Sequence, residues 1–387
     1  MSVLHVITGL ATGGAQQVLH RVLVHGTSES GRVTVLSLGD EGTYGSRIRA
    51  LGVRVYTLGM RRGLPGPAAL ARLNAVVRKT RPDCIHGWMY HGNLAAWLAR
   101  NLAPGRPALA WNIRHSLSDP SAEKPLTRQV LRWNRRLSGA PEALIYNSHR
   151  AREQHETFGF CSGKGRVIPN GFDLPASPPD LGTMAEVRAS VDLPKDALVV
   201  GHVARFHPMK DHAGFLRTAV RIAQTRDDVY VVLIGQGVTP DNAELTALIP
   251  KTLESRFRFL GARTDAQDLM RAMDVLCLSS RGEAFPNVLG EAMARGVPCV
   301  ATDVGDSAAL IGETGCVVAP RDDAALFRGL TSMLERTPDE LRALGVAARE
   351  RVEACFGMNM MIHQYDALER QLLRARFEGT RTPRGPL

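Results

Sequence analysis

The sequence predicts an α/β fold built from two doubly wound domains in tandem. Short, continuous apolar runs alternate with helical stretches through the first half of the chain, and the alternation restarts after a proline-rich break. Continuous apolar strands that alternate with helices indicate a parallel sheet covered on both faces. The length of 387 residues agrees, because one domain usually takes roughly 150 residues.

Seven candidate strands lie in the first half and six in the second. Each is a short apolar run, at residues 3–8, 33–38, 53–58, 84–86, 108–113, 144–147, 167–168, 198–203, 230–234, 257–260, 275–278, 299–301 and 316–318. The stretches between them with helical spacing or composition are residues 15–24, 68–79, 93–100, 126–137, 151–157, 214–224, 265–273, 288–294 and 324–334. The tail, from about residue 339 to 377, is helical without strands.

The break lies at residues 169–180, which read PNGFDLPASPPD. Four prolines in twelve residues, with an Asn-Gly pair, are typical of a linker. We therefore place a first domain at 1–171, a linker at 172–182 and a second domain at 183–355.

The excess positive charge of +10 lies entirely in the first domain. Residues 1–173 hold 23 Lys+Arg and 10 Asp+Glu, a net of +13, whereas residues 174–387 hold 25 and 28, a net of −3. Such asymmetry indicates that the first half meets an anionic partner, which leaves nucleic acid, a membrane surface or a phosphorylated substrate open.

Several protein classes are not expected. No apolar run approaches the 18 or so residues of a membrane span, and no basic segment precedes the first apolar run, so we expect no signal peptide. The six cysteines form no CxxC and no zinc-ligand spacing. We expect a cytoplasmic protein with reduced thiols.

A glycine-rich loop follows the first predicted strand and opens a helix. Its sequence is GLATGGA, with Gly13 and Gly14 adjacent. Adjacent glycines let the backbone approach a ligand, and a helix start offers free N–H groups to an anion. The loop lacks the G-x-G-x-x-G dinucleotide fingerprint, and an ordinary strand-to-helix turn is the alternative.

Two cations leave the first strand of the second domain. Arg205 and Lys210 stand five residues apart on one loop, in a half that is otherwise slightly acidic. A guanidinium fork with a point charge suits a diphosphate. The alternative is a solvated surface loop.

Two glutamates follow a later strand of the second domain. Glu283 lies in a loop and Glu291 in the next helix, within an apolar stretch. A carboxylate in such surroundings needs a hydrogen-bond donor, and sugar hydroxyls supply one. Residues 284–289, which include Asn287 and Val288, are expected to present backbone N–H groups at the helix start. Two surface glutamates are the alternative.

Together, these motifs resemble the retaining family-4 glycosyltransferases of the GT-B fold, over nearly the whole chain. Each match alone is weak, but their order and spacing are specific. The matches are Gly13-Gly14 to the glycine loop, residues 170–173 to the NG-x-D element, Arg205 with Lys210-Asp211 to the R…K-D signature, and Glu283 with Glu291 to the E-x7-E motif.

The resemblance implies two Rossmann-like domains facing across a cleft. The first would bind the acceptor and the second a nucleotide sugar, with a final helix at 356–387 returning to the first domain. Arg205 and Lys210 would neutralise the donor's diphosphate, the leaving group, assisted by the Gly14 N–H. The substrates would be a nucleotide sugar and a glycan or lipid-linked acceptor, as in surface polysaccharide biosynthesis.

The resemblance also assigns the donor's hydroxyls and base. Glu291 would hold the ribose and Glu283 the sugar, while the main chain at residues 260–263, up to Arg263, would contact the base. No metal or other cofactor is expected, since the sequence contains no Asp-x-Asp with which metal-dependent glycosyltransferases hold their ion.

Two histidines near strand ends of the first domain are candidates on the acceptor side. His115 follows the strand at 108–113, and family members often carry a histidine there, near the reacting centre. We take His115 as the group that orients or deprotonates the acceptor hydroxyl or stabilises charge at the anomeric carbon, and His91 as the second candidate. A purely structural histidine is the alternative for either.

The segment at residues 123–139 predicts a basic amphipathic helix. Leu126, Val130, Trp133 and Leu137 fall on one apolar face, and four arginines fall mostly elsewhere. Such a helix can contact an anionic membrane surface. The favoured interpretation is that the apolar face packs on the sheet and the arginines face solvent.

Two other functions compete with glycosyl transfer. A nucleotide-sugar 2-epimerase can share the architecture, but the E-x7-E motif with its basic partner argues against it. A nucleic-acid-binding protein is suggested only by the basic half, and recognisable nucleic-acid motifs are absent from the sequence. We expect no nucleic-acid partner.

Overall fold

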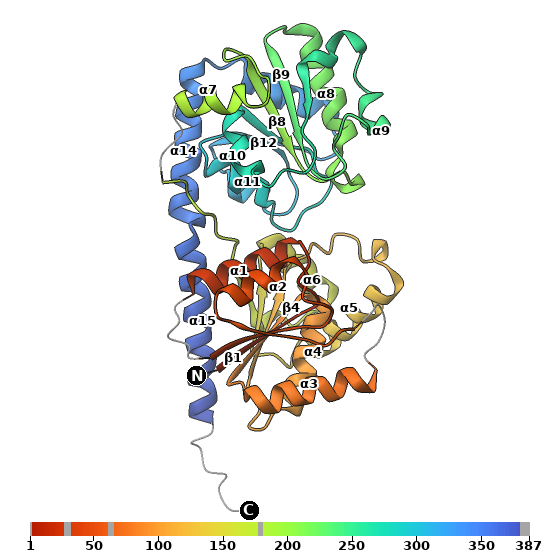
Figure 1. The fold of residues 1–387 in the computed structure, drawn as a ribbon, viewed down its shortest axis with the longest axis vertical. Helices are drawn as coiled ribbons and strands as arrows, with labels where there is room; N and C mark the ends of the chain where they lie inside the picture. The colour runs from red at the N-terminus through yellow and green to blue at the C-terminus, as the bar shows by residue number, and fades with distance from the viewer. Residues whose placement is uncertain (1, 27–31, 61–65, 177–180, 380–387) are drawn as a thin grey trace, which may run out of the picture. The chain divides into compact units, whose positions relative to one another are not determined.

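The chain divides into two compact units, each built on one sheet (Figure 1). The structure is a computed structural model that describes residues 2–26, 32–60, 66–176 and 181–379. Unit 1 comprises Met1–Asn170 and Met358–Leu387, and unit 2 comprises Gly171–Gly357. The predicted α/β class with two doubly wound sheets is confirmed.

Unit 1 contains a seven-stranded sheet in the order β3-β2-β1-β4-β5-β6-β7, with all neighbours parallel. The strands are β1 (Ser2–Ile7), β2 (Arg32–Ser37), β3 (Arg54–Thr57), β4 (Cys84–Trp88), β5 (Ala108–Ile113), β6 (Ala143–Tyr146) and β7 (Gly165–Val167). The helices are α1 (Gly14–His25), α2 (Gly42–Ala50), α3 (Pro67–Thr80), α4 (Met89–Leu102), α5 (Pro125–Leu137), α6 (His149–Phe158) and α15 (Met358–Gly379).

Strand β1 shows why these sequences form a buried parallel sheet. Val3 and Ile7 belong to the core shared with α1, α2 and α15, whereas Leu4 and Val6 belong to the core shared with α3, α4 and α5. All four side chains are at most 2% exposed. A strand that is buried on both faces must be apolar at consecutive positions, which the sequence pattern had indicated.

Unit 2 repeats this plan with a six-stranded sheet in the order β10-β9-β8-β11-β12-β13, again with parallel neighbours. Its strands are β8 (Leu198–Val203), β9 (Val229–Ile234), β10 (Phe257–Phe259), β11 (Val275–Leu278), β12 (Cys299–Thr302) and β13 (Gly315–Val318). Its helices are α7 (Leu181–Ala189), α8 (His212–Thr225), α9 (Ala243–Thr246), α10 (Ala266–Leu269), α11 (Asn287–Met293), α12 (Ser307–Ile311), α13 (Asp323–Leu334) and α14 (Pro338–Phe356).

The strand order reverses once in each sheet, between β1 and β4 in unit 1 and between β8 and β11 in unit 2. Loops on either side of such a reversal diverge beyond the carboxyl ends of the strands, and doubly wound proteins bind ligands there. Ligand-binding side chains are therefore expected at the carboxyl edges of these two reversals.

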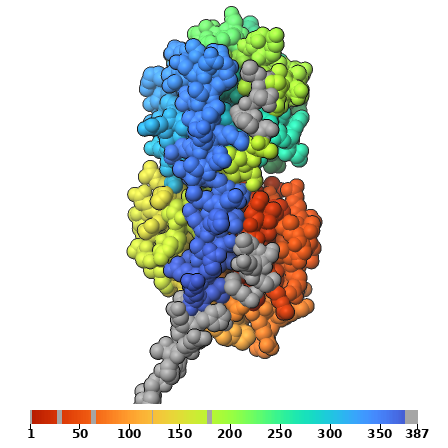
Figure 2. All heavy atoms as spheres, turned by 90° about the vertical axis from the view of Figure 1, so that its left-hand side faces the viewer, coloured from red at the N-terminus to blue at the C-terminus, as the bar shows by residue number. Residues whose placement is uncertain are grey.

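Helix α15 belongs to the core of unit 1 although it ends the described chain. Met361, Tyr365 and Leu368 are buried in the same cluster as β1 and α1. The Tyr365 hydroxyl donates to Asn112 Oδ1 of β5 at 2.8 Å and accepts from Arg114 at 2.8 Å. Figure 2 shows the helix laid along unit 1. Within the described ranges, no helix combines the length and apolarity that crossing a bilayer requires.

The expected linker contains one residue that is not linker-like. Phe172 is 1% exposed, stacks on Phe285 with ring centroids 6.1 Å apart, and donates its N–H to Phe356 O at 2.9 Å. Helix α7 begins at Leu181, inside the segment assigned to the linker. Burial of the Phe172 ring in the core of unit 2 is favourable, so this residue is fixed although a proline-rich segment follows it.

The packed face of α5 differs from the prediction. Val130, Leu131 and Asn134 are its buried residues, whereas Trp133 is 46% exposed and Leu126 is 43% exposed. The Asn134 amide explains the rotation, because it donates to Tyr90 O at 3.0 Å and to Val130 O at 2.9 Å and so belongs on the buried side. The interpretation that Trp133 packs on the sheet is therefore wrong.

We predict that Gly345→Ala destabilises unit 2, although alanine is the better helix former by about 1 kcal/mol. A Cβ on Gly345 in α14 would lie 2.0 Å from the backbone oxygen of Gly296, which has no side-chain freedom to yield. Overpacking of this kind costs about 1–3 kcal/mol. Urea unfolding followed by circular dichroism should show a net loss of stability.

The matched control is Val346→Ala, the next position on α14, whose side chain is 48% exposed. It should change the unfolding free energy by no more than about 0.5 kcal/mol. An increase in stability for Gly345→Ala would contradict the close approach of the two backbones.

Candidate active site

Two loops meet at the carboxyl edge of the unit 2 sheet, at its strand-order reversal. One follows β8 and carries Lys210, and the other follows β11 and begins with Ser279. The Ser279 hydroxyl contacts the backbone oxygens of Lys210 and Asp211 at 2.9 and 3.1 Å. The Arg281 N–H donates to Met209 O at 2.8 Å. The two loops therefore form one unit, although they are about seventy residues apart in sequence.

A histidine beneath the loops completes this interlock. His202, in β8, is fully buried, and burial lowers its pKa well below the ordinary value of 6.5. Its Nε2 lies 3.1 Å from Ser279 Oγ. Because the Ser279 hydroxyl hydrogen is directed at two carbonyls, the neutral His202 ring donates to it through Nε2–H. The imidazole thus orients the serine that joins the loops.

The interlock brings together Lys210 and Glu283, two of the predicted site residues. Lys210 Nζ forms an ion pair with Glu283 Oε1, and the Ser280 hydroxyl donates to the same carboxylate oxygen at 2.8 Å. The Lys210 and Glu283 side chains are partly buried, with 24% and 15% of their surface exposed, respectively. A carboxylate that accepts from an ammonium and a hydroxyl has lone pairs left for further hydroxyl donors.

Asp211, beside Lys210, has a structural role in the loop. It adopts a left-handed backbone (φ 47°), caps the start of α8 through the Gly214 N–H, and forms an ion pair with Arg281 at 2.7 Å. Its side chain is 7% exposed. We therefore attribute to Asp211 the sharp turn that presents Lys210.

Arg205 lies on the same loop as Lys210, directly beyond the end of β8. Its side chain is exposed, and among the described residues no carboxylate forms an ion pair with it. Backbone bonds from Ala204 to Ile234 O (2.9 Å) and from Phe206 to Gln236 O (2.8 Å) hold this segment against the end of β9. The backbone that carries the Arg205 guanidinium is thus fixed by hydrogen bonds on both sides of it.

Helix α11 carries Asn287, Val288 and Glu291, all half-buried. Its position is set by a close approach at Gly290, where a Cβ would lie 2.1 Å from the Phe172 ring. The preceding loop is held from the other side, because Thr302 Oγ1 donates to Ser280 O at 2.6 Å. Glu283 and Glu291 are thus carried on one rigid loop-and-helix segment.

Arg263 stands beyond β10, at the same edge of the sheet. The Gly235 N–H donates to Gly261 O at 2.8 Å, which ties this segment to the end of β9. The Arg263 guanidinium is occupied by Asp265 at 2.7 Å, and both side chains are more than 40% exposed. Because the guanidinium is already paired with Asp265, the Arg263 main chain is more available to a ligand than its side chain is.

In unit 1, Gly13 caps and Gly14 begins α1, the helix that follows β1 at the strand-order reversal. The Gln16 amide donates to Gly9 O at 2.8 Å and so closes the loop on itself. A Cβ on Gly13 would lie 2.5 Å from Gln16 Oε1, so the glycine keeps this closure possible.

His115 follows β5 and forms a pair with a residue that sequence reasoning missed. Its Nε2 lies 2.7 Å from Glu123 Oε1, and the ring is 45% exposed. A carboxylate only accepts hydrogen bonds, so Nε2 carries a proton, and in the neutral ring the lone pair is on Nδ1. Glu123 appeared in the sequence only as the start of the basic segment, and no local pattern connects it to His115.

Tyr90 packs beneath this pair. Its ring meets His115 edge-on with centroids 6.2 Å apart, and its hydroxyl lies 2.6 Å from His155 Nε2. Burial lowers the pKa of His155 to about 4, so His155 is neutral and accepts from the tyrosine. His91, the second candidate, follows Tyr90 in the first turn of α4, and burial lowers its pKa too. Both candidate histidines therefore lie at the carboxyl edge of unit 1.

Metal ligands are not assembled in the part of the chain that the structure describes, where no group of three or more His, Cys, Asp or Glu side chains could hold an ion. Of the predicted donor-binding residues, Arg205, Lys210 and Glu283 lie on strand-end loops of unit 2, and Glu291 lies in helix α11.

Comparison with known proteins agrees with these features. The family model for glycosyl transferases group 1 matches residues 197–336, and that for glycosyltransferase family 4 matches residues 12–175. The lipopolysaccharide core biosynthesis mannosyltransferase LpsB of Rhizobium meliloti is 26% identical over 349 residues, 84% of this chain and 91% of LpsB. The putative glycosyltransferase EpsF of Bacillus subtilis is 36% identical over 137 residues, 35% of either chain.

Solved structures share the fold over nearly the whole length. The Anabaena protein HepE, in its complex with UDP, superposes with a TM-score of 0.83 and covers 96% of this chain and 100% of its own, at 22% identity. The two family models together cover more than half of the sequence and fall one on each unit. The chain therefore belongs to glycosyltransferase family 4 and has the GT-B fold.

Proposed function

We propose that this glycosyltransferase moves a sugar from a nucleotide diphosphate to a hydroxyl of a glycan or lipid-linked acceptor. We propose further that it retains the anomeric configuration and uses no metal. The observation that carries the proposal is the grouping of Arg205 and Lys210 with Glu283 on interlocked loops of unit 2. HepE, solved with UDP and with UDP-glucose, supports a nucleotide-sugar donor, and LpsB supports a role in surface polysaccharide.

On the donor side, the chemistry needs stabilisation of the negative charge that develops on the departing diphosphate. Arg205 offers a planar fork of donors on a backbone that is bonded to the end of β9, and Lys210 offers a compact point charge on the interlocked loops. Cations that are already in place stabilise such charge without reorganising during the reaction. Glu283 and Glu291 then accept from hydroxyls of the sugar and the ribose, respectively.

On the acceptor side, the His115–Glu123 pair provides a proton acceptor. With Nε2–H directed at the Glu123 carboxylate, the Nδ1 lone pair can take the proton of an attacking hydroxyl. The negative charge of Glu123 then stabilises the imidazolium that forms, as in other carboxylate–histidine pairs. Glu123 is a positioning residue in this scheme, since it acts through His115.

A nucleotide-sugar 2-epimerase is the competing function. It would convert the donor alone, whereas a transferase needs an acceptor hydroxyl. Incubating the enzyme with nucleotide sugar and no acceptor, followed by chromatography of the sugar, separates the two functions. Rapid epimerisation would replace the transferase proposal.

Lys210→Ala and Glu291→Ala should each lower transfer by about 10²–10³-fold, the usual effect of removing one electrostatic contact to a transition state. Lys195→Ala and Glu254→Ala are matched controls, because they remove the same charges from exposed positions of unit 2. Circular dichroism should show all four variants folded. Full activity in either test variant would remove these residues from the site.

Glu123→Ala should lower kcat through His115. General base catalysis contributes about 10²–10⁴-fold, and we expect Glu123→Ala to lose part of that factor. In a His115→Ala background the same change should lose nothing further, because a residue that acts through another shows a non-additive double-mutant cycle. Glu153→Ala, an exposed glutamate on neighbouring α6, is the control. Equal losses in both backgrounds would contradict the pairing.

Thermal unfolding with a panel of UDP, GDP and other nucleotides should identify the donor base. A ligand at 100 times its Kd adds about 2.7 kcal/mol of stability. The stabilisation and the transfer rate should persist in EDTA, and NMR of the product should show the donor's anomeric configuration. Loss of activity in EDTA that added Mg²⁺ restores would contradict the metal-independent proposal.

A further inference from the structure

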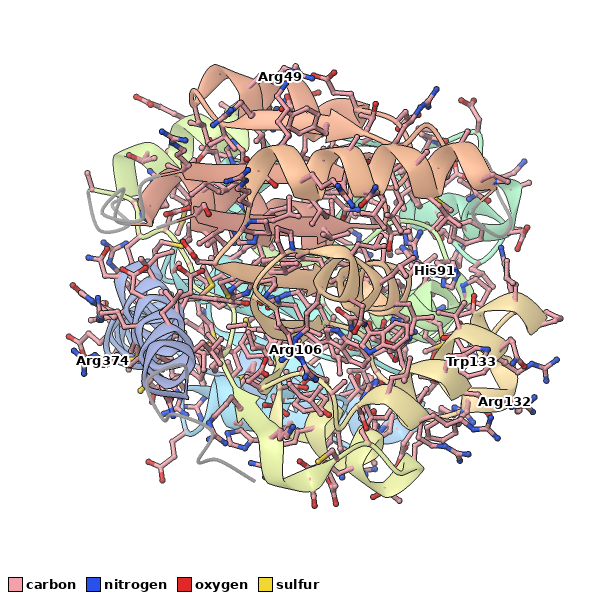
Figure 3. The ribbon with its side chains drawn as sticks, turned by 90° about the horizontal axis from the view of Figure 1, so that it is seen from below. Arg49, His91, Arg106, Arg132, Trp133 and Arg374 are labelled. Atoms are coloured by element: carbon pink, nitrogen blue, oxygen red, sulfur yellow. The ribbon has the colours of Figure 1, made fainter. Side chains whose placement is uncertain are left out.

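The outer side of helix α5 is a basic, partly apolar surface that packing leaves uncovered. Its buried side, with Val130, Leu131 and Asn134, faces into unit 1. On the other side Trp133 and Leu126, two helical turns apart, are 46% and 43% exposed. Figure 3 shows Trp133 and Arg132 on the outer side of this helix.

The charge of this surface is unbalanced. Helix α5 holds four arginines and no acidic residue, and in the described structure none of the four forms an ion pair. Arg132 and Arg136 are exposed, and the Arg136 guanidinium lies 5.6 Å from the centre of the Trp133 ring. Arg135 lies 5.4 Å from the Phe158 ring. Arg128 completes the set.

An exposed tryptophan flanked by unpaired arginines fits the surface of an anionic bilayer better than bulk water. An indole ring is stable at the boundary between lipid headgroups and acyl chains, and an arginine binds phosphate oxygens with several donors. A soluble polyanion would satisfy the arginines but would leave Trp133 and Leu126 exposed. Charge and apolar area together therefore favour lipid.

We propose that the outer side of α5 docks this enzyme on an anionic phospholipid bilayer. Trp133 and Leu126 enter the interface, and Arg132 and Arg136 contact lipid phosphates. Only Lys124 separates Glu123, which pairs with His115, from the start of the helix. Docking through α5 thus places the His115 loop next to the membrane. Lipid binding itself does not depend on the proposed reaction.

The test is co-sedimentation of the full chain with vesicles, without donor or acceptor. The wild-type protein should bind phosphatidylcholine vesicles that contain about one-third phosphatidylglycerol, and binding should fall steeply with salt and be absent on pure phosphatidylcholine. Of the four tryptophans, Trp88 and Trp111 are fully buried, Trp97 is half-buried against the core of unit 1, and Trp133 is 46% exposed, so a blue shift of tryptophan fluorescence on binding should come mainly from Trp133.

Two variants separate charge from insertion. Arg132→Glu with Arg136→Glu should weaken binding roughly tenfold or more. Trp133→Ala should remove most of the blue shift. Arg78→Glu with Arg106→Glu is the matched control, since it changes net charge equally at exposed positions on α3 and before β5, and it should bind as the wild type does.

Four results would overturn the proposal. They are equal binding to neutral and anionic vesicles, an equal loss in the control pair, binding of heparin or DNA with no preference for vesicles, and self-association that is lost in Trp133→Ala while vesicle binding is absent. Failure of vesicle binding in an enzyme that still transfers sugar would reject the docking surface and leave the proposed function intact.

Discussion

The hydroxyl of Ser279 is the contact that joins the two loops on which the proposed donor site depends. It joins the loop after β8 to the loop after β11, and neutral His202 donates to it from below. Together with the contacts of Arg281 to Met209 and Asp211, it lowers the conformational entropy that Lys210 and Glu283 would otherwise lose on meeting a ligand. With it, a cation and a carboxylate are preorganised at one edge of the sheet.

Both units bury a parallel sheet between helices, but they place different polar side chains at its carboxyl edge. Each sheet is buried on both faces, so its polar side chains collect beyond the carboxyl ends of the strands, where the backbone leaves the sheet. Unit 2 presents Arg205, Lys210 and Glu283 there. Unit 1 presents the His115–Glu123 pair there. Four of the arginines that make the first half basic lie together on α5.

Sequence reasoning succeeded for strands and failed for contacts between distant residues. Every predicted strand is present, because burial on both faces leaves an apolar run that is visible locally. Helix α2 was missed, since two glycines and several polar residues hide its amphipathic pattern. The face of α5 was misassigned because Asn134, a polar residue, takes a buried position through bonds to Tyr90 and Val130.

The sequence by itself determined the two-domain α/β architecture, the family and the residues that carry charge at the strand ends, because these follow from local patterns and motif spacing. Only the tertiary structure decided that Glu123 pairs with His115, that Ser279 and His202 hold Lys210 beside Glu283, and that Trp133 faces outward. Each of these depends on hydrogen bonds or packing between segments that the fold brings together, and the chain carries no local signal for such partners.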